Sequence, residues 1–470
     1  MSEESSRGAT GAEPDEPIPG DQPRRAAVEV NSDAGSAAEP STTLPIPAEP
    51  ISQTLAHTES AEARGHRITT GILLGVVGVL LVALVFVTHG NAQFALSDAL
   101  DVVKLPTITL PGTPTVLICG LLCLAAAFGY LSEQVPGRWR GVGGGVAGLA
   151  VVIGFVAWAA AGRSLPFLVT NQLNGTIAYA TPLILGGLAG VMGERSGVVN
   201  VAIEGQFLSA AFTSCVVGSI TGSIPVALIA GMIAGLLLGA LLALFTINYL
   251  VDQVVLGVVL NLLASGLTGF LYSQFVAPDP LRYNSAPVMA KISIPLLSKI
   301  PFLGPVLFQQ RGLAYLAVIA VVAVWFLLYH TKWGLRVRSV GEHPEAADTV
   351  GISVRAVRWQ AVLVGGLLAG LGGCFFTLGA TGQFTKDISA GNGFIALAAL
   401  IMGRWRPLPV ALMALFFGFV SQLASQMQTL NTPLPSQFLL LLPYVATVVA
   451  VAGLVGRVRG PAADGVNYVK

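Results

Sequence analysis

Apolar runs separated by short polar stretches make up most of this chain after residue 67. The first run, residues 68–88, is long enough to cross a bilayer, which needs about 20 apolar residues. Further runs lie near 115–131, 142–162, 174–193, 198–218, 223–246, 252–276, 313–330, 358–382, 393–403, 408–424 and 437–456. The pattern predicts an all-α polytopic membrane protein with about 10–12 transmembrane helices.

Two of these runs differ from a simple span. Residues 393–403 are too few to cross a bilayer and are predicted to form a half-helix or a re-entrant piece. Residues 198–218 contain Glu204 and are a second candidate for a broken helix. In addition, LGGLAG at 185–190 resembles VGGLLAG at 364–370, on helices expected to run in opposite directions. An inverted repeat and a chance similarity of Gly-rich helices both explain this pair.

Residues 1–67 have a different composition from the rest of the chain. They hold 12 of the 24 acidic residues and 5 of the 25 basic ones, with many prolines and almost no long apolar stretch. Such a segment buries too little surface to offset its chain entropy, so we predict a disordered acidic tail. It is either a partner-binding arm or, the interpretation we favour, an unstructured extension.

The composition argues against an ordinary soluble enzyme. Hydrophobic types make up 54% of the chain and charged types 10%, whereas a soluble domain usually carries about 25% charged residues. The net charge of +1 gives no reason to expect nucleic-acid binding. The chain lacks an ATP-binding phosphate loop, a zinc-protease motif and a nucleophile elbow. We therefore predict no catalytic residue, no metal and no cofactor.

The four cysteines lie inside apolar runs without a flanking set of metal ligands, and we interpret them as reduced core residues. They are Cys119, Cys123, Cys215 and Cys374.

The basic residues predict the orientation in the membrane. Arg64 and Arg67 precede the first apolar run. If the tail is inside and the spans alternate, the inside segments hold 18 of the 25 Lys and Arg residues. Positive charge accumulates on the cytoplasmic side, so we expect both termini to be cytoplasmic.

The longest predicted inside loop, residues 331–357, contains a short helix signal. Pro344 suits the first turn of a helix, the following residues 345–348 are amphipathic, and Gly351 suits its end. The loop is either a solvated connection or, as we favour, a docking helix for a soluble partner.

The segment GERSGVVNVAIEGQ, residues 193–206, places polar side chains between apolar helices. A charge at membrane depth is costly and usually faces a cavity or a partner. Glu204 is either an internally satisfied residue at a helix break or part of a substrate pathway. Other polar or aromatic side chains on apolar helices have interhelix bonding or core packing as the commoner explanation. The candidate pathway residues are Asn200, Glu204, Gln206, Asn261, Asn392 and Phe394.

Four segments in this order carry a resemblance to a known family. They are 193–205, DQVVLGVVLNLLASGLTGFL at 252–271, GLRVRSVGEHPEAADTVGI at 334–352 and GNGFIALAALIMGRWRP at 391–407. Together they resemble the transmembrane permease subunit of bacterial ATP-binding-cassette (ABC) importers for nucleosides and simple sugars, a branched-chain amino acid permease-like family. The resemblance covers roughly residues 165–460.

The resemblance implies a domain organisation and a set of partners. Residues 164–460 would form the permease core, preceded by transmembrane helices in 68–163 and followed by a cytoplasmic tail, 461–470. The expected partners are a cytoplasmic ABC ATPase, a second and related permease chain, an extracytoplasmic substrate-binding lipoprotein and the lipid bilayer of the plasma membrane, with no nucleic acid. ATP would bind to the separate ATPase chain.

The resemblance also assigns the loop at 341–351 to the ATPase-coupling site. Its predicted contact residues are Gly341, Glu342, Pro344, Glu345, Ala346, Ala347, Asp348 and Gly351. Nucleosides are the expected cargo. Simple sugars or branched-chain amino acids are the alternative within this class, and an ion-coupled secondary transporter is the alternative from another class.

Overall fold

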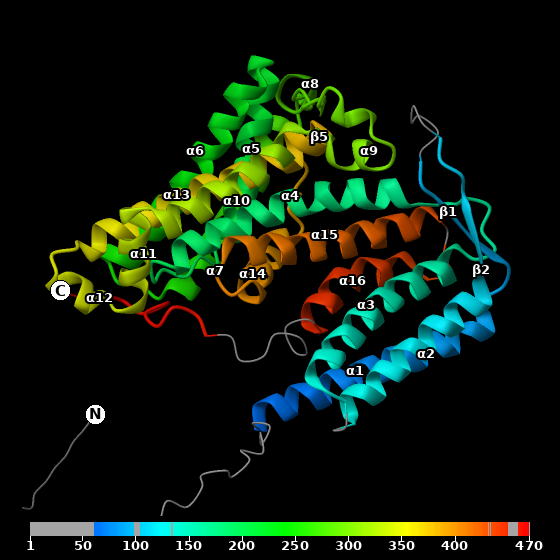
Figure 1. Cartoon of the computed structure of the whole chain (residues 1–470). Helices are drawn as coiled ribbons and strands as arrows, with labels where there is room; N and C mark the ends of the chain where they lie inside the picture. The colour runs from blue at the N-terminus through cyan, green and yellow to red at the C-terminus, as the bar shows by residue number, and fades with distance from the viewer. Residues whose placement is uncertain are drawn as a thin grey trace, which may run out of the picture. The chain divides into compact units, whose positions relative to one another are not determined.

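The computed structural model describes residues 61–97, 104–132, 135–430, 432, 434–449 and 459–469, all within one compact unit (Figure 1). In this part of the chain, ten helices are long and apolar enough to cross a membrane. Two shorter apolar helices, Asn392–Met402 and Ser436–Val448, correspond to the runs at 393–403 and 437–456. The predicted all-α membrane fold is thus confirmed. The predicted disordered tail lies outside the described residues up to residue 60.

The first three helices pack on one another: α1 (Ala61–Leu84), α2 (Gly112–Leu131) and α3 (Gly137–Ala160). Helix α1 begins before the expected start of the first span at residue 68. In this part of the helix the guanidinium of the buried Arg67 donates hydrogen bonds to the carbonyls of Tyr130 (3.1 Å) and Leu131 (3.2 Å) at the end of α2. This contact holds the first turns of α1 against α2.

A small sheet with the order β2-β1-β3 lies where this region meets the rest of the chain. β1 (Asn91–Ala95) pairs antiparallel with β2 (Ile108–Pro111) and parallel with β3 (Phe167–Leu168). A one-turn helix, Val85–Val87, leads from α1 toward β1. Apolar periodicity does not reveal such short strands, because each lies between two membrane helices.

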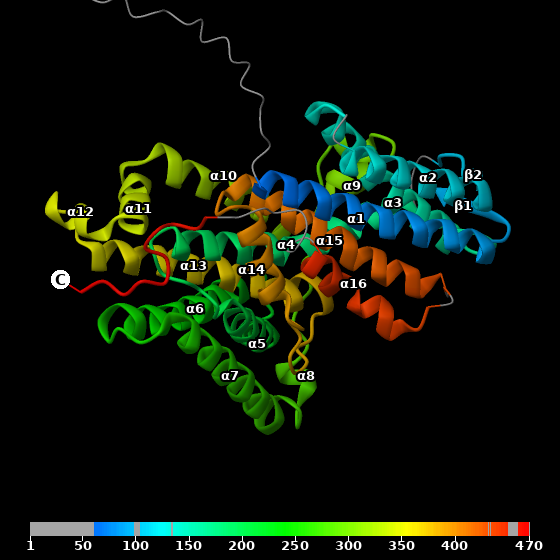
Figure 2. The ribbon, with the colours of Figure 1, turned by 90° about the horizontal axis from the view of Figure 1, so that it is seen from below.

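The remaining long helices form the core of the fold, with α13 packed against α4, α5 and α6 (Figure 2). The core helices are α4 (Val169–Glu194), α5 (Ile203–Thr221), α6 (Ile224–Ala243), α7 (Gln253–Leu271), α10 (Gly312–His330), α13 (Val354–Phe376), α14 (Asn392–Met402), α15 (Pro407–Thr429) and α16 (Ser436–Val449). Three of them continue into π-helical turns, at Leu244–Asn248, Tyr272–Val276 and Thr377–Thr381.

Glycines bring these core helices into close contact. A Cβ atom on Gly235 of α6 would lie 2.5 Å from the carbonyl oxygen of Gly366 on α13, and one on Gly365 would lie 2.8 Å from the carbonyl oxygen of Ala189 on α4. Small residues permit such backbone contact between membrane helices. The two Gly-rich stretches that suggest an inverted repeat therefore pack on each other, which explains their composition. The repeat itself stays a prediction.

The segments at the two ends of α10 differ. Before α10, the chain forms α8 (Pro280–Tyr283), β4 (Lys291–Ser293), a short helix at Leu297–Lys299, α9 (Leu303–Leu307) and β5 (Gln309–Arg311). β4 and β5 pair antiparallel. After α10 come α11 (Lys332–Glu342) and α12 (Pro344–Thr349). These two short helices form the predicted partner-docking loop.

Residues 459–469, which contain most of the predicted C-terminal tail at 461–470, pack against the rest of the protein. They lie against the turn that follows α4 and against the end of α11, and Ala463 is buried. The segment has no apolar run that would predict this packing. Its glycines and alanines fit there because they let the backbone approach its neighbours closely. All four cysteines are buried and free, as expected.

Candidate functional site

Helix α12 has the boundaries that the sequence predicts. Pro344 occupies its first turn, and Gly351 adopts a φ of +83°, which favours glycine, just after its end. The amide of Ile352 closes the helix by donating to the carbonyl of Ala347 at 3.1 Å. Ala347 is 4% exposed and anchors the helix, whereas Glu345 and Ala346 are exposed. The helix therefore presents a small polar surface while one side is fixed to the protein.

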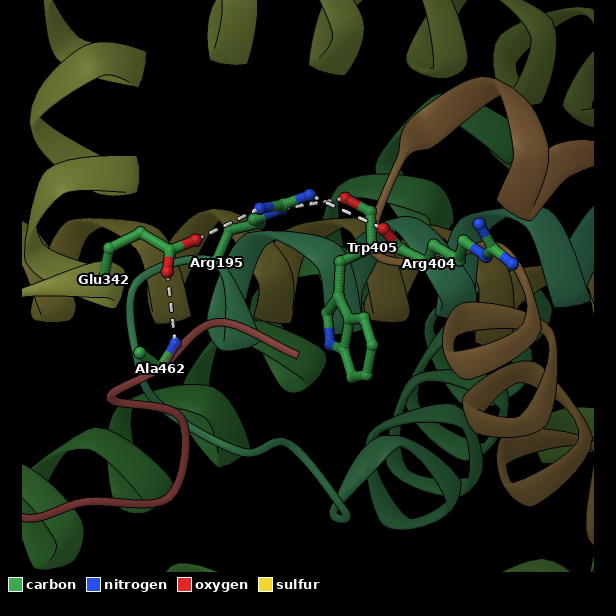
Figure 3. Close-up of polar contacts among 5 residues, drawn as sticks. All are labelled: Arg195, Glu342, Arg404, Trp405 and Ala462. Carbon is green, nitrogen blue, oxygen red and sulfur yellow. Dashed lines mark hydrogen bonds and ion pairs between the residues drawn. The ribbon is translucent and has the colours of Figure 1, made fainter. Parts of the chain in front are cut away.

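The residues just before α12 contact the turn that follows α4. A Cβ atom on Gly341 would lie 2.2 Å from the carbonyl oxygen of Arg195, so only glycine fits there without a shift. The Arg195 guanidinium lies 3.8 Å from the Glu342 carboxylate (Figure 3). The predicted coupling loop therefore touches the 193–206 segment directly.

Arg195 also fixes the turn between α14 and α15. Its Nε donates to the carbonyl of Trp405 at 2.9 Å, and its Nη2 lies 3.5 Å from the carbonyl oxygen of Arg404 (Figure 3). Arg404 and Trp405 both adopt a φ of +53°, which is unusual for residues other than glycine. The buried Trp405 indole N–H donates to the carboxylate of Glu194, at the end of α4. We name this set the junction: Glu194, Arg195, Gly341, Glu342, Arg404 and Trp405.

Glu204 connects α5 to the short helix α14. Its carboxylate accepts hydrogen bonds from the Ser389 hydroxyl (2.5 Å) and from the backbone amides of Gly391 (2.8 Å) and Gly393 (2.6 Å). A carboxylate at this position satisfies free amides and is favoured by the dipole at the start of a helix. Glu204 therefore holds the beginning of α14 in place, and protein donors already occupy its oxygen atoms.

Asn261 of α7 bonds the first turn of α5 and the turn that precedes it. Its Oδ1 accepts from the amide of Gly205 at 2.7 Å, and its Nδ2 donates to the carbonyl of Val201 at 3.0 Å. Both ends of the amide are used by the backbone. This is the interhelix bonding that the sequence leaves open as one explanation.

The remaining pathway candidates fall into two groups. Asn200 donates to Gln206 at 3.2 Å, while its Oδ1 and the Nε2 of Gln206 are buried without a hydrogen-bond partner among the described residues. Asn392 donates to the carbonyl of Ser389 at 2.7 Å, and Phe394 is 49% exposed. The structure thus places Glu204, Asn392 and Phe394 at the α5–α14 contact and Asn200 and Gln206 near the junction. Their role in a pathway stays a prediction.

Sequence reasoning did not select four residues of this region: Glu194, Arg358 and Trp405, which are buried, and Asp464, which is partly buried. In the sequence, Glu194 is interpreted as a charge at the edge of the membrane, and Trp405 is one residue of the 391–407 segment that carries the family resemblance. A charged residue within an apolar run is the available signal for Arg358, at the start of the 358–382 run. Asp464 lacks such a signal because its surroundings come from distant parts of the chain. The described residues contain no group of three or more His, Cys, Asp or Glu side chains that could hold a metal ion.

Comparison with known proteins places residues 172–456 in a sequence family described as "Branched-chain amino acid transport system / permease component". The nucleoside ABC transporter permease protein NupC of Lactococcus lactis subsp. cremoris is 40% identical over 320 residues, which cover 66% of this chain and 98% of that protein. The guanosine ABC transporter permease protein NupQ of Bacillus subtilis is 40% identical over 304 residues, or 63% and 95% of the two chains. A putative glucose ABC transporter permease protein of Haloferax volcanii is 32% identical over 266 residues, or 56% and 79%. No solved structure matches the chain significantly.

Proposed function

The chain belongs to the branched-chain amino acid transport system permease family, and we propose that it is the membrane subunit of an ABC importer for nucleosides. The observation that carries this proposal is that two relatives named as nucleoside or guanosine permeases share 40% identity with it over 95% or more of their length. The glucose permease relative shares less identity over a smaller part of its length. Nucleosides are therefore favoured over simple sugars.

In this proposal a separate cytoplasmic ATPase supplies the energy and docks on α12. The exposed Glu345 and Ala346 would enter a groove on the ATPase, and the buried Ala347 would keep the helix attached to the permease. Closure of the ATPases on ATP would push α12. Because Gly341 lies against Arg195, the push would reach the 193–206 segment without a flexible connection.

The cargo would pass near the polar atoms that the protein leaves unpaired. Asn200 Oδ1 and Gln206 Nε2 are an acceptor and a donor of the kind that a nucleoside's hydroxyl and base groups can pair with. Asn200 lies in the turn before α5, and Gln206 lies in the first turns of α5. The full assembly would include a second permease and a substrate-binding lipoprotein in the plasma membrane, with both termini of the chain in the cytoplasm.

Uptake of labelled uridine and adenosine by cells with and without the gene tests this function. We expect uptake to fall in the deletion strain and to be unaffected by excess unlabelled ribose or leucine in the wild type. Competition by ribose would indicate that the transported cargo is a simple sugar. Uptake that continues in a strain whose partner ATPase cannot hydrolyse ATP would support ion-coupled transport instead.

A further inference from the structure

Residues 460–468, here named the strap, lie beyond the 172–456 match to the permease family. The strap follows the apolar run of the last helix and is red in Figures 1 and 2. It meets the coupling loop, the turn after α4, the start of α7 and the start of α13.

One side of the strap is bonded to the residues just before α12. The amide of Ala463 donates to the carbonyl of Gly341 at 2.9 Å, and the amide of Ala462 donates to the Glu342 carboxylate at 3.3 Å (Figure 3). The ion pair between Glu342 and Arg195 has a half-exposed carboxylate and contributes little by itself. The strap therefore adds a backbone hydrogen bond to the residues before α12, whereas the Arg195–Glu342 contact consists of side chains alone.

The other side of the strap is bonded to α7 and α13. The buried Arg358 guanidinium donates to the carbonyl of Val466 at 3.0 Å. Asn467 donates to the carbonyl of Leu250 at 2.7 Å and lies 3.4 Å from the Gln253 side-chain nitrogen. Gln253 in turn accepts from the amide of Val199, in the 193–206 segment, at 2.7 Å.

The turn after α4 also fits the strap closely. Gly197 has a φ of +87°, and a Cβ atom there would lie 2.9 Å from the carbonyl oxygen of Ala463 and 2.8 Å from the Arg358 guanidinium. The contacts of Gly197 and Gly341 place the strap backbone between the two predicted signature segments. Movement of either segment alone would break one set of these contacts.

A partly buried acid, Asp464, lies in the middle of the strap. The Asp464 carboxyl lies beside the Glu194 carboxyl and near the Arg358 guanidinium. Two adjacent carboxyls do not both ionise readily, so a proton on one of them stabilises the pair. Burial raises the pKa of Asp464 from its ordinary 3.8 to about 7. Two carboxyls, one proton and one guanidinium give a neutral cluster, which tolerates burial better than an unpaired charge does.

We propose that the strap is a positioning element that locks the ATPase-contacting loop to the 193–206 segment, so that both move as one body during transport. This inference rests on the proposed function, because it gives the strap a place in the same coupling step. Release of the strap would leave α12 able to follow the ATPase without moving the pathway. ATP would then be hydrolysed with little transport.

The strap also shapes the surface beside α12. A pocket of about 450 Å³ is lined by Asp348, Gly351, Ile352, Ser353, Val354, Arg355 and Tyr468. Tyr468 belongs to the strap, and the other lining residues belong to the coupling loop and the start of α13. A docked ATPase would therefore meet the strap as well as α12.

The test compares the wild-type complex with two strap variants in lipid nanodiscs. Ala463→Pro removes the amide that donates to Gly341, and Asn467→Ala removes the bonds to Leu250 and Gln253 while retaining all backbone amides. Val469→Ala is the control, because Val469 is 67% exposed and lies outside the strap. Two quantities are measured: hydrogen exchange of the 341–351 and 460–468 amides, and nucleoside transported per ATP hydrolysed.

We expect wild-type amides in both segments to be protected, and to change together when a non-hydrolysable ATP analogue is added. In both strap variants the amides of both segments should lose protection from hydrogen exchange. The amount of nucleoside transported per ATP hydrolysed should fall by at least about fivefold. Freely exchanging strap amides in the wild type would overturn the inference. So would an unchanged transport ratio in Asn467→Ala, the variant to rely on if Ala463→Pro fails to fold. Absence of nucleoside uptake in the wild type would refute the proposed function, while the exchange measurement would still decide the strap.

Discussion

The three N-terminal helices differ from α4 and α13, the most buried helices of the core, in what surrounds them. Within an 18-residue window of the α1 span 22% of the residues are buried, whereas 78% are buried in the corresponding windows of the α4 and α13 spans. Among the described N-terminal residues, up to 160, the buried polar side chains are Arg67 and Thr88. The core instead buries many, including Glu194, Asn200, Glu204, Gln206, Asn261 and Arg358. Apolar residues thus cover a lipid-facing surface in one region and surround a polar interior in the other.

This difference coincides with the limits of the family match, which begins at residue 172. The polar interior lies where the proposed pathway and coupling contacts are, and it costs stability unless every group is paired. We therefore expect substitutions in the core to be far more damaging than equally conservative ones in the N-terminal helices. The following predictions test that contrast.

The largest expected effect is at Glu204. Glu204→Ala would leave the Ser389 hydroxyl and the amides of Gly391 and Gly393 without their acceptor, at a cost of about 3–5 kcal/mol. The variant should not accumulate as a folded protein, as judged by size-exclusion chromatography in detergent. Glu204→Gln retains one acceptor oxygen and should lose less. Normal accumulation of Glu204→Ala would mean that these bonds do not hold α14.

A charge reversal on α12 should abolish function without affecting folding. Glu345 is exposed, so Glu345→Arg leaves the permease packing intact but places a positive charge in the proposed ATPase groove. Uptake should fall by at least about tenfold, because an unfavourable charge at an interface costs several kcal/mol. Glu345→Gln is the milder control. Wild-type uptake by Glu345→Arg would contradict docking at this helix.

A matched glycine pair compares the two regions directly. On α6, Gly235→Ala would place a Cβ atom 2.5 Å from the α13 backbone, whereas nothing lies within 4 Å of the same atom on Gly145 of α3. The core substitution should destabilise by about 1–3 kcal/mol. Gly145→Ala should be neutral or slightly stabilising, because alanine favours helices over glycine. The midpoints of thermal unfolding of both variants measure this difference. Equal midpoints would show that the core helices do not depend on glycine more than the N-terminal helices do.

The strap should weaken as the pH rises. The pKa of Asp464 is raised from 3.8 to about 7 when the strap is packed. Between these two pH values the packed strap binds a proton that the released strap does not, so a rise in pH favours release. Strap stability is therefore greatest below pH 4 and declines by at most about 1.4 kcal/mol per pH unit until about pH 7. Hydrogen exchange of the 460–468 amides at pH 5.5 and 7.5, corrected for intrinsic rates, measures this. Asp464→Asn should reduce the dependence, because the neighbouring Glu194 carboxyl is the other titratable group of the cluster. An unchanged slope in that variant would show that Asp464 does not carry the effect.

The smallest expected effect is that of removing the acidic tail. Deletion of residues 1–60 removes no predicted cargo or coupling motif, so uptake should be unchanged. The deletion ends before the first residue of α1. Expression measured in parallel separates a transport defect from lower protein levels. Loss of uptake at normal expression would show that the tail is a partner-binding arm.

The sequence predicts the features that depend on neighbouring residues. Apolar length fixes the membrane helices, including the short one at 392–402, and Pro344 and Gly351 fix the ends of α12. It also predicts a break near Glu204, although it leaves the partners of that carboxylate open. Each of these depends on a run or a turn signal that can be read over about twenty residues or fewer.

Tertiary structure alone decides the pairings between distant segments. The indole of Trp405 bonds to Glu194, 211 positions earlier, and Arg358 bonds to Val466, 108 positions later. Hydropathy measures only the preference of each segment for lipid or water, so it cannot show which helix ends meet. Helix packing brings these ends together, and the low polarity of the surroundings makes each unpaired group costly. For that reason the sequence determines a membrane permease with a short helix at Pro344–Thr349, whereas the fold determines that residues 460–468 lie against the junction.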